Sequence, residues 1–291
     1  MRPRVCVVTG ATRGIGRATA LALAKLGGDI VVVGRDARRL ETARIECERA
    51  GLNARAFAVH ADFASLDSVR RGATEIAERW PAIRLLVNNA GLNSPTRQTT
   101  VDGYELTFQV NCLSPFLLTT LLSRSLANDA PSRVVDVTSV FARFGRVDVD
   151  DLMFARRRYT STRAYTQSKL ASAMLAVELS ARLASAGISV NAVSPALVAT
   201  DLLRHHWYSA PWLRPIWSRL LLTPEAAAER VVRVATSEAL AGVSGECFAA
   251  GIRPVSMPRA ARDARARQHV WDAVVALTGI APTLPAPAPP R

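Results

Sequence analysis

Short apolar runs rich in valine recur along the chain and alternate with longer segments in which alanine and leucine dominate. Such short runs, bounded by glycine or polar residues, are typical of buried strands, whereas the longer segments have helical length. Strands that alternate with helices form right-handed βαβ units. The pattern therefore predicts the α/β class, with a doubly wound, Rossmann-type parallel sheet and helices on both faces. The expected strands are Arg4 to Val8, Asp29 to Val33, Ala56 to His60, Leu85 to Val87, Val134 to Val137, Ser189 to Val193 and a last one near Glu246 to Ala249.

The length of the chain suits one domain. At 291 residues it can form a single α/β domain with a sizeable core, which we expect to span residues 1–280. Residues 281–291 contain five prolines and are predicted to be a disordered tail. The first expected strand begins almost at the N-terminus and no apolar run reaches membrane-spanning length. We therefore expect neither a signal peptide nor a transmembrane helix.

The cysteines predict neither disulfides nor a metal site. All four are scattered, with no Cys-x-x-Cys pair, and the histidines form no cluster suited to zinc. Unpaired cysteines are typical of a reducing compartment, so we expect a cytoplasmic location. The four are Cys6, Cys47, Cys112 and Cys247.

The chain is strongly basic, with a formal net charge of +13 carried almost entirely by arginine. The arginines are dispersed, no nucleic-acid motif is present, and the one tight cluster is Arg156 to Arg158. A compositional bias of the source organism is the simplest interpretation, and no nucleic-acid partner is predicted. Attraction of an anionic substrate, a carrier-bound substrate or a membrane surface is the alternative reason for the charge.

A glycine-rich turn follows the first expected strand. Gly10, Gly14 and Gly16 lie between that strand and a segment from Arg17 to Leu26 that is rich in alanine and leucine. In a strand, glycine turn and helix, the backbone can approach a pyrophosphate, which then sits on the helix N-terminus. The spacing Gly-x-x-x-Gly-x-Gly differs from the commoner Gly-x-Gly-x-x-Gly, and a glycine turn alone is weak evidence. We interpret it as a dinucleotide site.

The residues after the second expected strand bear on the choice of cofactor. Arg35 follows Gly34 there, and Arg13 lies in the glycine turn. A carboxylate at this point binds a free ribose 2′-hydroxyl, whereas arginine accommodates a 2′-phosphate. The two arginines therefore favour NADP(H) over NAD(H), although Asp36 could instead take the ribose hydroxyl. Two solvated arginines in an arginine-rich chain are the alternative interpretation.

Tyr165 and Lys169 are four residues apart, and Lys169 is one of only two lysines in the chain. Residues four apart on a helix share one face, so the ammonium can reach the phenol or a ligand beside it. A neighbouring cation stabilises phenolate and would lower the tyrosine pKa toward neutrality. Tyr165 could then act as a general acid or base. A surface pair with no chemical role is the alternative.

With these features in place, the chain resembles the short-chain dehydrogenase/reductase family. Asn88-Asn89-Ala90-Gly91 resembles an element that follows the family's fourth strand, and Pro195 to Thr200 resembles the segment that covers the nicotinamide. The resemblance implies Asn111, Ser139, Tyr165 and Lys169 as catalytic residues. It implies cofactor contacts from Gly10, Thr12, Arg13, Gly14, Ile15, Gly16, Arg35, Asp62, Asn88, Ala90, Gly91, Tyr165, Lys169, Pro195, Val198 and Thr200.

The amino-acid sequences of these motifs are most similar to the retinol-dehydrogenase-like branch of the family, for example in Phe108 to Asn111 and Ala164 to Leu170. Three positions depart from the family pattern. Ala196 replaces the usual glycine of the nicotinamide segment, and Asp136 and Thr138 replace the usual asparagine and serine of the fifth strand. Ser139 is therefore the preferred substrate-facing hydroxyl, with Thr138 as the fallback.

The resemblance implies interconversion of a ketone or aldehyde and its alcohol by hydride transfer from NADP(H). Ser139 would bind the carbonyl oxygen, Tyr165 would donate the proton, and Lys169 would bind the nicotinamide ribose. Asn111 would hold a water that links Lys169 to solvent. A homodimer or homotetramer through the helices of Asn111 and Tyr165 is also implied.

The segment at residues 201–222, which carries three of the five tryptophans, is expected to form a lid over a hydrophobic substrate. Core packing, a dimer contact or a peripheral membrane contact are alternatives for this segment. A different class of function also stays open. The same fold could catalyse a non-redox epimerisation, dehydration or cyclisation on a bulky secondary metabolite, or serve as a cofactor-binding regulatory protein.

Overall fold

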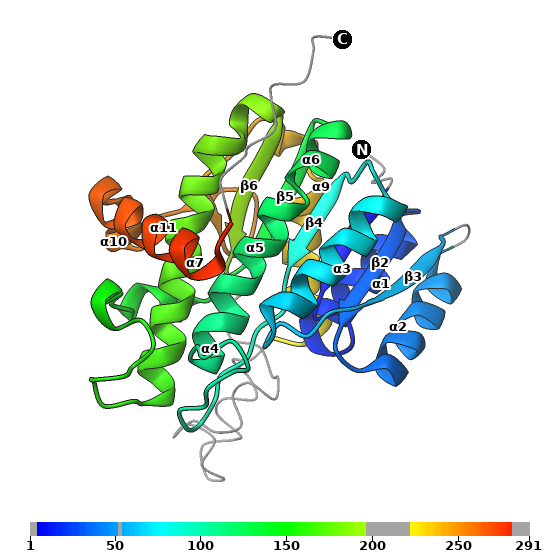
Figure 1. Ribbon diagram of the computed structural model, residues 1–291. Helices are drawn as coiled ribbons and strands as arrows, with labels where there is room; N and C mark the ends of the chain where they lie inside the picture. The colour runs from blue at the N-terminus through cyan, green and yellow to red at the C-terminus, as the bar shows by residue number, and fades with distance from the viewer. Residues whose placement is uncertain (1–4, 52–53, 196–221, 281–291) are drawn as a thin grey trace, which may run out of the picture.

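The strands form one sheet whose order is β3-β2-β1-β4-β5-β6-β7-β8 (Figure 1). The computed structural model describes residues 5–51, 54–195 and 222–280. All neighbouring strands from β3 to β7 run parallel, and only β8 is antiparallel to its neighbour. The strands are β1 Val5–Thr9, β2 Asp29–Gly34, β3 Ala56–His60, β4 Leu85–Asn88, β5 Ser132–Val137, β6 Ile188–Val193, β7 Cys247–Phe248 and β8 Pro254–Val255.

Helices connect the strands and cover both faces of the sheet. The α-helices are α1 Gly14–Lys25, α2 Ala37–Ala50, α3 Leu66–Arg79, α4 Leu106–Phe108, α5 Ser114–Leu121, α6 Ser123–Asn128, α7 Ser161–Leu183, α9 Pro224–Thr236, α10 Arg259–Arg262 and α11 Ala264–Thr278. A π-helical turn, η1 Gln109–Leu113, joins α4 to α5. Short 3₁₀ turns are η2 Val140–Phe144, η3 Val149–Asp151, η4 Ala184–Ala186 and η8 Glu238–Leu240.

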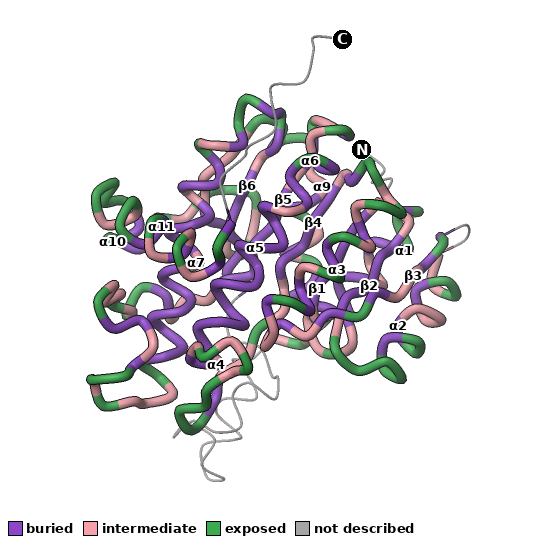
Figure 2. Tube along the Cα trace, viewed as in Figure 1, coloured by how far each residue is buried: buried purple, intermediate pink, exposed green. Residues whose placement is uncertain are grey.

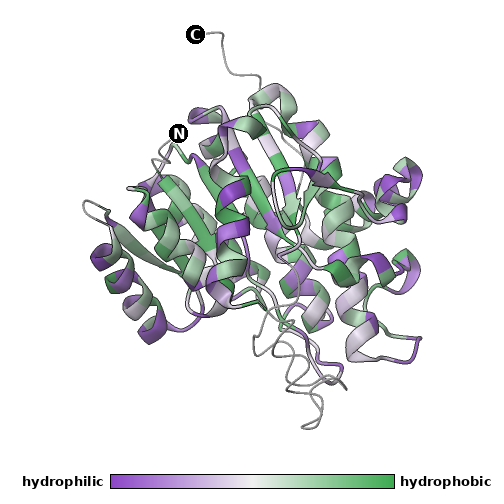
Figure 3. Cartoon of the chain, turned by 180° about the vertical axis from the view of Figure 1, so that it is seen from behind, coloured by the Kyte–Doolittle hydropathy of each residue, from purple (hydrophilic) through white to green (hydrophobic). Residues whose placement is uncertain are grey.

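The sheet separates two hydrophobic cores. Side chains of α3, α5, α7 and α11 pack on one face, and those of α1, α2 and α9 pack on the other. Strand residues alternate between the cores: Val134 belongs to the first, whereas Val135 and Val137 belong to the second. The strands and the inner helix faces are buried (Figure 2), and Figure 3 shows the apolar strands between helices with polar outer faces. This two-sided burial explains why the strands appear in the sequence as continuous apolar runs.

The expected α/β fold is confirmed. Each predicted strand is present within one or two residues of its expected bounds, because buried parallel strands need unbroken apolar sequence. The antiparallel strand β8 and the C-terminal helices α10 and α11 were not predicted. All four cysteines are buried and free, and the described residues contain no cluster suited to a metal ion. No helix among them is long and apolar enough to cross a membrane.

The C-terminal helices α10 and α11 pack against α7, and α11 also contacts η1. Trp271 of α11 meets Phe116 of α5 edge to face, with ring centroids 5.2 Å apart, and the Arg182 guanidinium of α7 lies 3.9 Å from the Trp271 ring centroid. The same helices α5 and α7 were expected to form the subunit interface. Part of their outer surface is thus occupied by the chain itself, and the dimer or tetramer stays a prediction.

Candidate active site

The carboxyl ends of β1 and β4 hold the glycine turn in place. Asn89, which follows β4, donates through Nδ2 to the carbonyl oxygen of Thr9 at 2.9 Å. The Thr9 hydroxyl in turn accepts from the backbone amides of Asn89 and Ala90, both at 3.0 Å. Because β1 lies where the strand order reverses, this edge is the place at which open α/β sheets bind ligands.

The glycines let the backbone pack more closely here than side chains would permit. Gly10 and Gly14 have φ angles of +63° and +54°, in the left-handed region that favours glycine. A Cβ on Gly16 would lie 2.2 Å from Asn89 Nδ2 and 2.4 Å from the Gly10 carbonyl oxygen. The turn is therefore a backbone cradle of the kind that fits a dinucleotide pyrophosphate.

Helix α1 begins directly after this turn and presents its N-terminus to the same place. Its N-cap residue, Arg13, makes no side-chain capping bond, and the first turn contains no acidic residue. No carboxylate of the helix therefore competes there for an anion, which the helix dipole and the terminal N–H groups favour. Of the predicted cofactor residues, Thr12 lies in this turn and Ile15 lies in the first turn of α1.

Substituting Gly16 by alanine is expected to weaken cofactor binding strongly. The added methyl group must displace Asn89 or the Gly10 backbone, which together shape the cradle. We expect the Kd for NADPH to rise at least about 30-fold, corresponding to roughly 2 kcal/mol. Fluorescence titration measures it, with Gly251→Ala as the control because a Cβ at Gly251 meets no atom within 4 Å and its backbone lies outside the left-handed region. A Gly16→Ala protein that binds NADPH normally would contradict the assignment of the cradle.

Arg35 and Asp36 follow β2 at the position predicted to face the cofactor ribose. Arg35 is exposed there, and its carbonyl oxygen lies 3.1 Å from His60 Nε2. Asp36 caps helix α2: its Oδ1 accepts from the Arg39 amide at 3.0 Å, and its Oδ2 lies 3.5 Å from Arg39 Nε. The Asp36 carboxylate, which was the alternative partner for the ribose hydroxyl, thus has a structural role as the N-cap of α2.

Two other predicted cofactor residues lie in fixed turns. Asp62, after β3, accepts from the Ala64 amide at 3.0 Å, and its own amide donates to Ser68 Oγ at 3.0 Å. Pro195 lies just beyond β6, where its carbonyl oxygen accepts from Arg230 at 3.4 Å. Val198, Thr200 and Ala196 lie outside the described residues, as does all of the expected lid except Leu222.

Asn88 differs from its neighbour Asn89 in the direction of its side chain. Asn88 Nδ2 donates to Thr119 Oγ1 and to Asp136 Oδ1, both at 2.8 Å, and the residue is buried. It therefore ties β4 to α5 and β5, while Asn89 binds the glycine turn. Asn89 was absent from the predicted set of site residues. Because successive residues of an extended chain point to opposite faces, the sequence could have indicated that only one of the two asparagines faces the glycine turn.

Ser139 and Tyr165 meet at the carboxyl end of β5. Ser139 lies two residues after this strand and caps η2, where its Oγ accepts from the Phe141 amide at 3.3 Å. Burial raises the pKa of the Tyr165 phenol to about 12, and a hydrogen bond with Ser139 acts in the opposite direction. The expected lowering of the tyrosine pKa toward neutrality is therefore wrong for this geometry, because desolvation outweighs the available stabilisation.

Lys169 lies one turn further along α7 and is buried. Its Nζ donates to the carbonyl oxygen of Val137, the last residue of β5, at 2.8 Å. A Cβ on Gly91 would lie 3.5 Å from this Nζ and 3.2 Å from Asn111 Oδ1, so Gly91 leaves space between the two side chains. Burial lowers the Lys169 pKa to about 8. Because this value is still above 7, the amine is largely protonated at neutral pH.

Asn111 occupies the centre of the π-helical turn η1, which the sequence did not predict. Its Oδ1 accepts from the Leu92 amide at 2.8 Å, and its Nδ2 donates to the Leu92 carbonyl at 2.9 Å and to Ser168 Oγ at 3.0 Å. The side chain thus fixes the loop after β4 against α7. The expected water between Lys169 and solvent stays a prediction.

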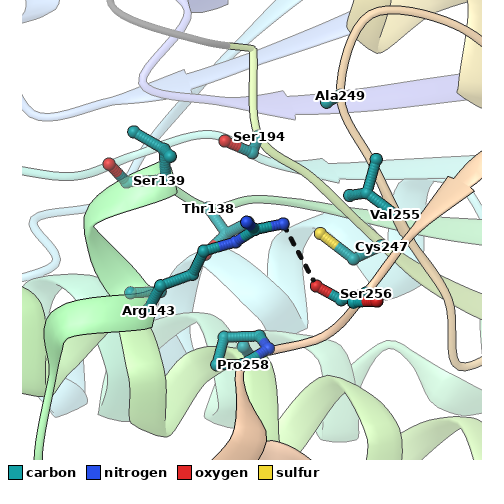
Figure 4. Close-up of a pocket in the computed structure, with 12 residues that line it drawn as sticks. Thr138, Ser139, Arg143, Ser194, Cys247, Ala249, Val255, Ser256 and Pro258 are labelled. Atoms are coloured by element: carbon teal, nitrogen blue, oxygen red, sulfur yellow. Dashed lines mark hydrogen bonds between the residues drawn. The ribbon is translucent and has the colours of Figure 1, made fainter.

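A small cavity of about 70 Å³ lies beside Ser139, between the ends of β5 to β7 and the segment after β8 (Figure 4). The Arg143 guanidinium reaches across it and donates to the Ser256 carbonyl at 3.4 Å. The Thr138 hydroxyl is buried and has no hydrogen-bond partner. The lining consists of Thr138, Ser139, Val140, Ala142, Arg143, Ala173, Ser194, Cys247, Ala249, Val255, Ser256 and Pro258.

Comparison with known proteins identifies the family. The family model described as short chain dehydrogenase matches residues 4–209, and the chain belongs to this family. It is retinol-dehydrogenase-like: retinol dehydrogenase 13 of Homo sapiens is 39% identical over 282 residues, covering 95% of this chain and 85% of that protein.

Solved structures of the same fold provide a second comparison. A crystal structure from Mycobacterium paratuberculosis superposes with a TM-score of 0.76 at 29% identity, covering 95% of this chain and 93% of that one. The Pseudomonas aeruginosa RhlG/NADP active-site complex is 26% identical with a TM-score of 0.68, covering 85% of this chain and 94% of that one. The protein is therefore an oxidoreductase of the kind that interconverts alcohols and carbonyl compounds.

Proposed function

We propose that the protein is an NADP(H)-dependent oxidoreductase that reduces a hydrophobic ketone or aldehyde, with Tyr165 as the proton donor. The observation that carries the proposal is the convergence of Ser139, Tyr165 and Lys169 at the end of β5, on the same sheet edge as the glycine cradle. Helix α7 supplies the phenol and the amine, and the strand end supplies the hydroxyl and the Val137 carbonyl.

The chain's own groups fit a nicotinamide dinucleotide. The backbone cradle and the N-terminus of α1 suit the pyrophosphate, and Lys169 is placed to bind ribose hydroxyls near Tyr165. Arg35 and Arg13 support a 2′-phosphate and hence NADP(H), as does the role of Asp36 as a helix cap. The related RhlG was solved as an NADP complex, which agrees with this choice.

The protonation states favour reduction. The bound cofactor supplies a hydride to the carbonyl carbon. Ser139 hydrogen-bonds the carbonyl oxygen and stabilises the negative charge that develops there. Tyr165 is neutral throughout the physiological range because its pKa is about 12, so its proton is available to that oxygen. Oxidation needs the phenolate instead and should therefore accelerate as the pH rises.

The substrate is proposed to be an apolar carbonyl compound, and a retinoid is the leading candidate because of the retinol dehydrogenase relatives. The cavity beside Ser139 offers the inner end of a substrate site, with largely apolar contacts from Val140, Ala142, Ala249 and Val255. A cytoplasmic location, peripheral membrane contact and the oligomeric state stay predictions of the sequence.

Arg35→Ala is expected to raise the KM for NADPH about 10- to 100-fold and to leave the KM for NADH within a few-fold. Loss of a charged hydrogen bond to phosphate is worth about 1.5–3 kcal/mol. Steady-state kinetics with both cofactors measures the ratio, and Arg49→Ala, at the exposed far end of α2, is the control. Equal effects on both cofactors would contradict recognition of a 2′-phosphate.

The test of the proposed function is incubation with NADPH and a panel of lipophilic aldehydes and ketones, retinal included. Nicotinamide absorbance and product mass are followed together. We expect one cofactor oxidised for each alcohol formed. Product of unchanged redox state, formed without cofactor consumption, would instead identify a non-redox enzyme, and cofactor binding without any product would favour a regulatory protein.

A further inference from the structure

Asp136 is a buried carboxylate to which the proposed reaction assigns no role. The residue is 7% exposed and lies on β5, the strand that leads into Ser139 two residues beyond its end. Val134 faces the core of α5 and α7, while Val135 and Val137 face the opposite core. Because strand residues alternate, Asp136 points to the side of the sheet that α7 covers. An acid in such a layer is unusual unless it is paired or functional.

Neutral groups make the direct contact with this carboxylate. Asn88 Nδ2 donates to Asp136 Oδ1 at 2.8 Å and also donates to Thr119 Oγ1. None of the ion pairs within 4 Å among the described residues includes Asp136. The carboxylate is therefore held in place by an amide rather than by a cation.

The cation that interacts with Asp136 is the Lys169 ammonium, which lies over the end of the same strand. Lys169 Nζ donates to the carbonyl oxygen of Val137, the residue next to Asp136. Both side chains are buried in the layer between β5 and α7, where opposite charges interact strongly, and no direct ion pair joins them. The Cys112 thiol of η1 is the third group in this electrostatic set.

We propose that Asp136 is a positioning residue for carbonyl reduction, whose buried carboxylate keeps the Lys169 side chain in the ammonium form without forming a direct ion pair with it. This arrangement leaves the ammonium hydrogens free for the Val137 carbonyl and for ribose hydroxyls. A direct carboxylate partner would compete for those hydrogens. The catalytic part of the inference rests on the proposed function, whereas the electrostatic part concerns the protein alone.

The charges around Lys169 support this assignment. Asp136 faces it from β5, Cys112 from η1 and Tyr165 from the same helix. Burial raises the pKa of the Cys112 thiol and of the Tyr165 phenol, so both are neutral near neutral pH. Burial also raises the Asp136 pKa to about 6 and lowers the Lys169 pKa to about 8. Both groups are thus charged between about pH 6 and 8, and Asp136 supplies the negative charge of the set.

The chain's two lysines, Lys25 and Lys169, allow a direct test. Lysine labelled with ¹³C at Cε gives two NMR signals in the full-length protein, and exposed Lys25 is the internal reference. We expect Asp136→Asn to increase the acid dissociation constant of Lys169 about tenfold, which is the lower end of the effect of a nearby opposite charge. Lys25 should not change. An unchanged Lys169 midpoint in the folded variant would overturn the proposal.

Two further measurements test the proposal without relying on the Asp136→Asn variant. In the wild-type protein, the Lys169 signal should show a second inflection near pH 6 as Asp136 ionises, and its absence would overturn the proposal. Asp136→Glu retains the charge and should restore the wild-type Lys169 midpoint. Asp151→Asn is the matched control, since Asp151 is also buried but is bonded to Arg157 and to backbone amides of its own loop.

Activity distinguishes this inference from the proposed function. If carbonyl reduction occurs, the loss of kcat/KM at high pH should begin at lower pH in Asp136→Asn than in wild type. Coincident pH profiles in an active variant would overturn the positioning role. If the Lys169 signal shifts as expected while no carbonyl compound is reduced, the electrostatic assignment stands and the proposed function fails.

Discussion

Replacing Tyr165 by phenylalanine is expected to lower kcat for carbonyl reduction by about 10²- to 10⁴-fold, the usual contribution of a general acid. The phenol hydroxyl, which forms a hydrogen bond with Ser139, is the proposed proton donor, and phenylalanine removes it while retaining the ring. Because the cradle and Arg35 lie elsewhere, the Kd for NADPH should stay within about threefold, which corresponds to less than 1 kcal/mol. Steady-state kinetics and fluorescence titration measure the two effects.

Tyr159→Phe is the matched control for this substitution. Tyr159 is half-buried in the loop before α7, and its hydroxyl donates to the Ser94 carbonyl at 2.9 Å. Its loss removes a hydrogen bond worth about 1 kcal/mol of stability without touching the reacting atoms. A Tyr165→Phe enzyme that is as active as Tyr159→Phe would show that another group donates the proton.

Asp136→Asn is expected to stabilise the protein at neutral pH by up to about 3 kcal/mol. The pKa of Asp136 is raised from 3.8 to about 6 in the folded chain, and each unit corresponds to about 1.4 kcal/mol. Below about pH 4 the Asp136 carboxyl is protonated in both the folded and the unfolded chain, so the substitution does not change the free energy of unfolding there. The gain develops between about pH 4 and 6 and is complete above pH 6, where the folded protein must bury the ionised group.

Urea unfolding at pH 4 and pH 7.5 measures this difference. Asp151→Asn should have the opposite sign, because bonds to Arg157 and to backbone amides lower the Asp151 pKa to about 2. Its carboxylate stabilises the folded state at neutral pH, and this contribution is lost as the pH falls through about 2. Equal effects of the two substitutions at pH 7.5 would contradict the assigned environments.

The fold was predictable because each parallel strand is buried on both faces and appears as an unbroken apolar run. The glycine turn was also predictable. Gly10 and Gly14 occupy backbone conformations that other residues rarely adopt, so glycine is needed at these positions and is visible in the sequence. In contrast, β8 pairs through only two residues, too few for a periodic pattern to be visible. Packing of α11 on α7 depends on tertiary contacts such as that of Trp271 with Arg182.

Residue types at the site were easier to predict than their environments. The spacing of Tyr165 and Lys169 and the family resemblance of Ser139 predicted these three residues. In the structure they lie near the end of β5. The pKa of Tyr165 was predicted in the wrong direction, because desolvation depends on how deeply α7 is buried and not on the spacing of two residues. The different roles of Asn88 and Asn89 likewise follow from the opposite directions in which the two side chains point at the end of β4.

Transfer of deuterium from the reduced cofactor tests the central claim most directly. NADPH carrying deuterium at the transferable position of the nicotinamide is mixed with the protein and a lipophilic carbonyl compound that it converts, and the product is analysed by mass spectrometry and NMR. We predict one deuterium on the carbinol carbon of each alcohol molecule, with equal consumption of cofactor. A product that carries no deuterium, formed while the cofactor stays reduced, would contradict the proposed hydride transfer.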